Sequence, residues 1–251
     1  MFRIRMANAK LWKNLIGAIS TLIDEGSFNA DKDGMKLRAM DPSHVAMVDF
    51  EWPKAVFDEY VCDEPIKLCI NFSEMLKFLK RIGNDESIDL NFDPKNAKLN
   101  IVLKSKYTRT FSMATLEPSS EEIPMPKVSF NSMARVTTDT LKNSMDDVST
   151  VSDQIQFETS KDKISMKASG DLGTASIDIE NGSGELLSLE VKQPSKATYS
   201  LNYILEMVKA ASNLSDIVSV ELSSDMPIRL NFEMPEKGKL QYYLAPRIEN
   251  S

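Results

Sequence analysis

His44 is the only histidine in the chain, so a catalytic triad or a histidine-based metal site would have to be built around it. Asp41 and Asp49 lie close to it in the sequence, but nothing nearby supplies an activated nucleophile. We therefore interpret His44 as a surface or pocket-lining residue in a loop before a strand, and not as a catalytic group.

A second candidate is a calcium loop. Asn29, Asp31, Asp33 and Gly34 imitate the first six positions of an EF-hand. An EF-hand needs a bidentate glutamate at its twelfth position, where this chain has Met40, and it needs flanking helices, where the pattern indicates strands. The sequence therefore argues against calcium binding.

The remaining candidates for chemistry are equally weak. Cys62 and Cys69 have no accompanying histidine, which fits two buried free thiols better than a disulfide framework or a zinc site. Residues 182–184 read GSG but lack the preceding strand and following helix of a phosphate cradle. The acidic residues are dispersed, so a two-metal nuclease has no cluster to use. The sequence predicts a protein that is not an enzyme and that needs no metal or cofactor.

Basic residues form a more informative pattern. Two stretches with helical spacing carry lysine and arginine on the face opposite their apolar stripe. The first stretch has no acid before Asp24, and the second has only Glu74. This bias indicates an anionic partner, although ordinary solubility charges explain it equally well. The residues are Lys10, Lys13, Lys77, Lys80 and Arg81.

Length and composition limit the class of protein to which these elements can belong. The chain has 251 residues, of which 42% are hydrophobic, so it can bury one large core or two ordinary ones. No apolar run of membrane-spanning length and no secretory signal core occur, which favours a cytoplasmic or nuclear protein. The net charge of −7 would by itself argue against a nucleic-acid partner, so the distribution of the charges decides the question.

The two halves of the chain repeat each other. An offset of 129 residues places Lys13-Asn14 on Lys142-Asn143 and Lys32-Asp33 on Lys161-Asp162. The same offset superposes apolar positions late in each half, including Leu76 on Leu205. A constant register of this kind predicts two copies of one domain.

Each copy shows the same order of patterns. A short strand (2–6 and 134–138) leads into a helix, and strands around a turn at residues 31–34 follow, where Gly34 can take positive φ. A second helix is predicted at 72–82 in the first copy and at 201–211 in the second, and the last strands at 107–113 and 240–244. Two helices and roughly nine short strands predict an α+β domain with an antiparallel sheet and both helices on one face.

Residues 116–130 separate the copies. Pro118, Pro124 and Pro126 exclude a helix or a central strand, so this stretch is predicted to be a connector. Serine and glutamate at 119–122 would keep its first half in solvent, and Ile123 would lay its second half on a surface. The predicted domains are 1–115 and 131–251, with the connector at 116–130.

These features together resemble a known family. The repeat, the proline-bearing connector, the stretch LRAMDPSHV at 37–45 and the ending YYLAPRIE at 242–249 closely resemble the proliferating cell nuclear antigen family of DNA sliding clamps, archaeal type. The resemblance covers essentially the whole chain.

The resemblance implies a ring of three subunits, with the helices lining a central hole and an acidic rim outside. It implies double-stranded DNA as a partner bound without sequence specificity, and self-association as a homotrimer. It also implies a DNA polymerase, a clamp loader, a flap endonuclease and a DNA ligase, each docked through a short peptide motif, and the cytoplasm of an archaeon, or a nucleus, as the location. The DNA-facing residues would be Lys10, Lys13, Lys77, Lys80, Arg81, Lys142 and Lys209.

Two further surfaces follow from the resemblance. Subunits would join by pairing of edge strands 107–113 and 173–179, with Lys106 or Arg109 expected to meet Asp178 or Glu180. The interface residues would be Tyr107, Arg109, Phe111, Ala175, Ile177 and Asp178. Partners would insert a short helix into a pocket formed by Met40, His44, Val45, Ile123, Pro124, Pro227, Tyr243, Ala245 and Pro246.

The sequence departs from the family in its second copy. Lys142 shares its predicted helix with Asp139, Asp146 and Asp147, and Lys209 shares its own with Glu206. This keeps open a subunit of a heterotrimeric or checkpoint-type clamp. The alternative from another class, a metal-dependent nuclease, lacks an acidic or histidine cluster.

Overall fold

The computed structural model describes residues 1–118, 123–171 and 173–248. The chain divides into two compact units. The first comprises residues 1–42, 48–123 and 234–240, and the second comprises 43–47, 124–233 and the chain from 241 onward. No helix among the described residues is long and apolar enough to cross a membrane.

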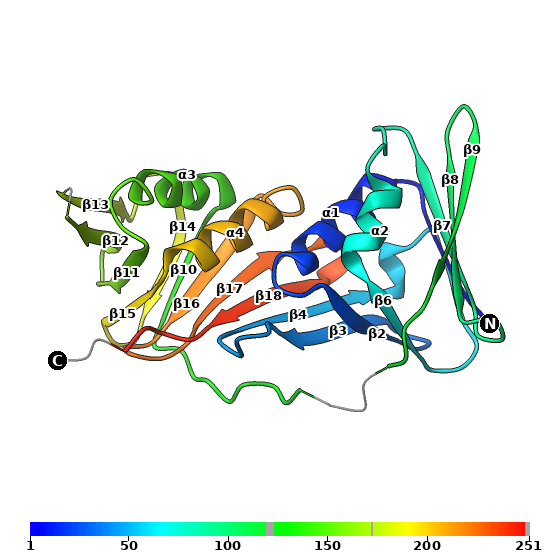
Figure 1. The fold of residues 1–251 in the computed structure, drawn as a ribbon. Coiled ribbons are helices and arrows are strands. Elements are labelled where there is room, and N and C mark those ends of the chain that lie inside the picture. Colours follow the sequence, from blue (N-terminus) through cyan, green and yellow to red (C-terminus); the bar gives the residue numbers. More distant parts are fainter. Residues whose placement is uncertain (119–122, 172, 249–251) are drawn as a thin grey trace. The chain divides into compact units, whose positions relative to one another are not determined.

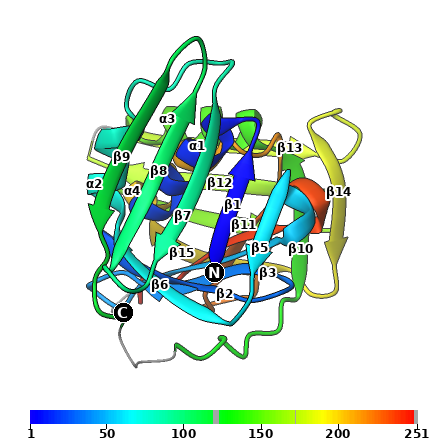
Figure 2. The same ribbon diagram turned by 90° about the vertical axis from the view of Figure 1, so that its right-hand side faces the viewer.

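The first unit contains two antiparallel sheets and two helices. One sheet has the strand order β5-β1-β7-β8-β9, which Figure 2 shows side by side, and the other contains β4-β3-β2-β6. The elements are β1 (Phe2–Met6), α1 (Ala9–Ser20), β2 (Glu25–Ala30), β3 (Gly34–Met40), β4 (Ala46–Pro53), the 3-10 turn η1 (Lys54–Val56), β5 (Glu59–Cys62), β6 (Ile66–Asn71), α2 (Phe72–Leu79), β7 (Ser87–Asp93), β8 (Lys98–Lys104) and β9 (Thr108–Ala114).

The second unit has the same construction. Its strands follow the orders β14-β10-β16-β17-β18 and β13-β12-β11-β15, and α3 and α4 lie side by side (Figure 1). The elements from residue 132 onward are β10 (Ser132–Thr137), α3 (Thr138–Val148), β11 (Gln154–Thr159), β12 (Lys163–Gly170), β13 (Gly173–Glu180), β14 (Leu186–Val191), β15 (Ser195–Ser200), α4 (Leu201–Ala211), β16 (Ile217–Leu222), β17 (Ile228–Glu233), η2 (Pro235–Lys237) and β18 (Lys239–Leu244), of which η2 belongs to the first unit.

The predicted repeat is confirmed by this correspondence. Adding nine to each strand number of the first unit gives the strand orders of the second. Helices α2 and α4 begin at Phe72 and Leu201, which are 129 residues apart as the offset requires. The amide of Phe72 donates to the carbonyl of Asp24 at 2.8 Å, and that of Leu201 donates to Asp153 at 2.9 Å, so the same hydrogen bond starts both helices.

Two details of the sequence interpretation are wrong. The strands of each copy form two sheets, whereas one sheet was expected. Helix α2 ends at Leu79 and not at residue 82, so Lys80 and Arg81 lie in the turn that follows it. Local spacing could not reveal this end, because side chains from distant residues satisfy the backbone groups of the turn.

Each helix is held by an apolar face and, in three cases, by a side-chain cap. Trp12, Leu15 and Ile16 bury the inner face of α1. Asn8 accepts hydrogen bonds from the first-turn amides of α1, and Asn71 and Thr137 do the same for α2 and α3. In the first unit, α1 and α2 lie together on the face of β2 and β6 (Figure 1), so their outer faces are left for other contacts.

The predicted turn at residues 31–34 is confirmed. The side chain of Asp31 accepts from the amides of Asp33 and Gly34 at 2.8 and 3.3 Å. Gly34 has φ of +153°, and a Cβ atom there would lie 2.1 Å from the carbonyl oxygen of Trp52. Only glycine fits this close approach between the turn and β4.

Candidate functional site

The basic residues of the first unit occupy α1, α2 and the turn after α2. Lys10 and Lys77 are exposed on the two helices, and no ion pair of either occurs among the described residues. Lys80 and Arg81 are exposed in the turn. The predicted cluster is therefore brought together in one domain, although two of its members do not stand on a helix.

Lys13 connects the two helices. Its ammonium group donates to the backbone carbonyl of Lys80 at 3.3 Å, which satisfies one of the carbonyls that the end of α2 leaves open. A positive charge at that position also interacts favourably with the negative end of the helix dipole. Lys13 is half-buried, so it supports the position of Lys80 as well as adding charge.

The second unit is less basic on its helices. Lys142 on α3 is half-buried. Lys209 on α4 forms an ion pair with Asp146 on α3, with 2.7 Å between Nζ and Oδ1. Glu206, which the sequence placed on the same helix, is not its partner. The pair neutralises Lys209 through a neighbouring helix, a contact that no spacing within α4 could indicate.

Strands β9 and β13 are the outermost strands of their sheets and have a strand partner on one side only within the described chain. Along β9, half-buried Arg109 and Phe111 alternate with exposed threonine and serine. Along β13, half-buried Ala175 and Ile177 alternate in the same way with exposed polar residues. On each strand, one face carries these half-buried side chains. The outer edge leaves backbone N–H and C=O groups without a strand partner in the described chain.

Arg109 on β9 and Asp178 on β13 have partners within their own domains. Arg109 forms an ion pair with Glu86 at 2.6 Å. Asp178 pairs with Lys163 at 2.6 Å, and the hydrogen bond from that lysine lowers the pKa of the Asp178 carboxyl. An ion pair between Arg109 and Asp178 of two subunits would require both to leave these partners.

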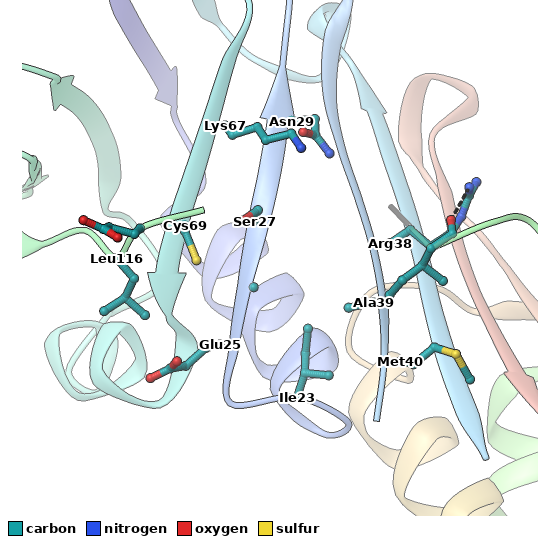
Figure 3. Close-up of a pocket in the computed structure, with 13 residues that line it drawn as sticks. Ile23, Glu25, Ser27, Asn29, Arg38, Ala39, Met40, Lys67, Cys69 and Leu116 are labelled. Atoms are coloured by element: carbon teal, nitrogen blue, oxygen red, sulfur yellow. Dashed lines mark hydrogen bonds between the residues drawn. The ribbon is translucent and has the colours of Figure 1, made fainter. Parts of the chain in front are cut away.

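A pocket of about 580 Å³ lies on the outer face of β2, β3 and β6 in the first unit. Figure 3 shows Arg38, Ala39 and Met40 along β3 on one side, and Cys69 with Leu116 on the other. Arg38 donates to the carbonyl oxygen of Ile123 at 3.3 Å and to Asp49 at 3.2 Å, so it fastens the connector to the sheet. Met40 and Ile123 from the predicted docking set both line this pocket.

The other predicted docking residues lie in the second unit. They are His44, Val45, Pro124, Pro227, Tyr243, Ala245 and Pro246. Val45 keeps 38% of its surface exposed, and its carbonyl accepts from the amide of Ala245 at 2.8 Å. Tyr243 is only 4% exposed, so it packs beneath the exposed residues of this set.

Arg229 is a residue that sequence reasoning missed. Its guanidinium carbon lies 4.7 Å from the ring centre of Phe130 in the connector and 5.9 Å from that of Tyr243. It also pairs with Glu221 through both carboxylate oxygens and donates to the Tyr243 hydroxyl at 3.3 Å. Arg229 therefore holds the connector against β17 and β18 of the second unit, a role that depends on residues distant in the sequence.

The residues considered for catalysis or metal binding do not form a site in the described part of the chain. His44 is exposed, with φ of +57°, in the loop before β4, as expected. Both cysteines are free; Cys69 is buried, but Cys62 is only half-buried, contrary to expectation. Within the described part of the chain, no group of three or more histidine, cysteine or acidic residues could hold a metal ion. The connector acids Glu121 and Glu122 lie outside the described residues.

Comparison with known proteins identifies the fold and the family. Residues 1–122 match the N-terminal domain of proliferating cell nuclear antigen, and residues 124–247 match its C-terminal domain. The DNA polymerase sliding clamp of Methanococcus vannielii is 35% identical over 246 residues, covering 97% of this chain and 98% of that one. DNA polymerase sliding clamp 1 of Pyrobaculum aerophilum is 34% identical over 242 residues, covering 96% of each.

Solved structures agree with this assignment. The crystal structure of PCNA from Thermococcus kodakaraensis superposes with a TM-score of 0.93 at 25% identity, covering 98% of this chain and 100% of that one. A PCNA2-PCNA3 complex from Sulfolobus tokodaii superposes with a TM-score of 0.91 at 27% identity, covering 98% and 99%. With both domain models matched and relatives above 30% identity over nearly the whole length, the chain belongs to the proliferating cell nuclear antigen family.

Proposed function

We propose that the chain works as a DNA sliding clamp by closing into a ring through two of its edge strands, β9 and β13. The observation that carries the proposal is that β9 and β13 are unpaired on one side and have matching alternation of half-buried and exposed residues. Pairing β9 of one subunit with β13 of the next satisfies both rows of backbone groups. The apolar contribution would come from Tyr107, Phe111, Ala175 and Ile177.

The DNA contact that we propose is electrostatic and carries no base readout. Lys10, Lys77, Lys80 and Arg81 would bind phosphates of the duplex, with smaller contributions from Lys13, Lys142 and Lys209. Contacts to phosphates alone bind every register of the duplex about equally, which permits sliding. Ring closure makes retention topological, so the affinity of the individual contacts can stay low.

The docking of partners would use the connector. Ile123 and Met40, which line the pocket of the first unit, would supply apolar surface suited to an anchor of a short helix. DNA polymerase, clamp loader, flap endonuclease and DNA ligase are the proposed partners. The chain itself would supply no catalysis, and it would act on chromosomal DNA in the cytoplasm of an archaeon, or in the nucleus of a eukaryote. A partner held this way meets its DNA at an effective concentration on the order of millimolar.

The second candidate is one subunit of a heterotrimeric clamp. The neutralisation of Lys209 by Asp146 favours it, since a weakly basic subunit could be complemented by more basic ones. Light scattering of the isolated chain separates the two: a stable trimer supports the homotrimer, and a persistent monomer at micromolar concentration supports the heteromer.

The function is tested by retention on DNA of different topology. After loading, the clamp should remain on closed circular duplex through gel filtration and be lost when the circle is cut. Ile177→Asp should break the proposed seam and abolish retention, and Leu187→Asp, at a site 41% exposed on β14, is the matched control. Ile123→Asp should leave retention intact and abolish stimulation of a clamp-dependent polymerase. Equal retention on circular and cut DNA would refute the ring.

A further inference from the structure

Arg109 and Glu86 form a charged pair that is largely buried. Their side chains are 16% and 10% exposed, whereas the surface pair of Lys36 and Glu51 is 54% and 43% exposed. Burial of two charges is unfavourable unless further hydrogen bonds satisfy them. Residues around this pair supply further hydrogen bonds to both side chains.

Glu86 fixes two points of the backbone besides binding Arg109. Its carboxylate accepts from the amide of Gly83 at 3.3 Å, in the turn that follows α2. Its backbone carbonyl accepts from the amide of Ala9 at 2.7 Å, at the start of α1. One acidic residue therefore sets the end of the α2 turn and the beginning of α1.

Arg109 adds a third point. Its Nη2 atom donates to the carbonyl of Arg81 at 3.3 Å and to Glu86 at 2.6 Å. The two N–H groups of Nη2 can serve both acceptors at once, and a lysine side chain ends one bond short of this atom. The turn that carries Lys80 and Arg81 is thus fastened to β9 by a side chain of β9 itself.

The pair is specific to the first domain. The 129-residue offset places Ser215 where the first domain has Glu86, and the Ser215 hydroxyl donates to the nearby carbonyl of Ile217. No ion pair of the described residues takes the place of the Arg109–Glu86 contact in the second domain. The pair therefore occurs only in the domain that holds the exposed basic turn and the open edge strand β9.

We propose that Arg109 and Glu86 are positioning residues that hold Lys80 and Arg81 in place for phosphate contact and tie this turn to the subunit seam. The proposal rests on the proposed clamp function. Arg109 also contacts a residue at the edge of the sheet: its guanidinium lies 5.9 Å from the ring centre of Tyr107, which is 66% exposed. A neighbouring subunit that covers Tyr107 would restrain Arg109, and with it the basic turn. In this role Arg109 would stay paired with Glu86 when the subunits join.

The decisive variant is Glu86→Gln, because two explanations predict opposite signs. If only net charge mattered, removing an acid would strengthen DNA binding. If Glu86 positions the turn, DNA binding should weaken, by about three- to tenfold at 0.1 M salt, and the slope of log affinity against log salt should fall by about 0.5 to 1. Tighter or equal binding with an unchanged slope, in an intact trimer, overturns the proposal.

Arg109→Lys is the second variant, since it keeps the charge but its side chain ends one bond short of the position of Nη2. It should lower the salt slope as Glu86→Gln does. Lys36→Gln is the control, because it removes one positive charge from an exposed pair away from the turn, and it should leave the slope unchanged. A wild-type protein that is not retained on circular DNA would refute the clamp function, whereas retention with indistinguishable variants would refute the positioning role alone.

Hydrogen exchange keeps the test valid even if a variant does not assemble. The amide of Gly83 should exchange about tenfold faster in Glu86→Gln and in Arg109→Lys than in the wild type, in trimer or monomer alike. The Ala9 amide bonds to the backbone of residue 86, so it should change less. Unchanged protection of Gly83 in both variants would show that the pair does not hold the turn.

Discussion

Replacing Asp146 by asparagine should strengthen DNA binding by releasing Lys209. The two side chains are 43% and 46% exposed, with 2.7 Å between the charged atoms. An ion pair of that exposure contributes about 0 to 1 kcal/mol to stability. Asp146 also stands near the end of α3, where a negative charge opposes the helix dipole by about 0.3 to 1 kcal/mol. These effects offset each other, so the free energy of unfolding should hardly change.

The effect on DNA binding should be much larger. Each added lysine–phosphate contact steepens the dependence of log affinity on log salt by about 0.9, which at 0.1 M salt corresponds to roughly eightfold in affinity. Three released lysines in a trimer give an upper bound of about 2.7 in slope. Because a duplex in a ring does not touch all subunits equally, we expect a change of about one to two.

The control for this experiment is Asp147→Asn. Asp147 is exposed on the same helix, and no ion pair of it occurs among the described residues. Its replacement removes the same charge without releasing a lysine, so affinity should rise slightly with the slope unchanged. The assay is equilibrium binding of each trimer to a short duplex across a salt series. Equal slopes for Asp146→Asn and Asp147→Asn would refute the reasoning, since the ion pair would then have no effect on DNA contact.

Two further predictions concern stability. Gly34→Ala should lower the free energy of unfolding by about 2 kcal/mol or more, because its Cβ would lie 2.1 Å from the Trp52 carbonyl oxygen. Gly17→Ala, on α1 with open space around it, should raise the free energy of unfolding by about 0.5 to 1 kcal/mol. Urea unfolding measures both changes. The hydrogen bond from Lys167 lowers the pKa of Glu158 from its ordinary value of 4.5, so the stability that Glu158 contributes is present above that pH and is lost as pH falls. The stability difference between the wild type and Glu158→Gln should therefore shrink between about pH 5 and pH 3, and a constant difference would contradict this assignment.

The sequence predicted the parts of the fold that depend on local periodicity. The repeat, the four helices and the turn at Gly34 follow from spacing and from residue types that have few alternatives. The division of each copy into two sheets does not, because the partner of a strand is chosen by contacts between distant segments. Strand ends were predicted only to within about two residues, because the ends of secondary-structure elements fray.

The end of α2 shows what local reasoning cannot reach. Its sequence continues with helix-forming residues to Ile82, and Asn84 offered a natural stop. The helix ends at Leu79 because Lys13, Arg109 and Glu86 satisfy the backbone groups of the following turn. Tertiary contacts of this kind override a propensity of a few tenths of a kcal/mol per residue.

The candidate site was predicted with the same limits. The resemblance indicated which basic residues belong together, but not that Lys209 is neutralised from another helix. It placed Arg109 at the seam because arginine on an edge strand opposite an acidic strand suggests a pair. The structure gives both charges partners inside their own domains, so the seam is better explained by backbone pairing and apolar contact than by an ion pair.

The open strands also bear on why the assembly should close. An interface between β9 of one subunit and β13 of the next is head-to-tail, and such interfaces form either a ring or an unlimited filament. Which of the two forms depends on the rotation that each contact imposes. In an assembly of identical subunits, every β9–β13 junction imposes the same rotation. Where that rotation closes a ring, every β9 and every β13 is paired, and no further subunit can add. Small oligomers of one size should therefore predominate, with no concentration-dependent growth in light scattering.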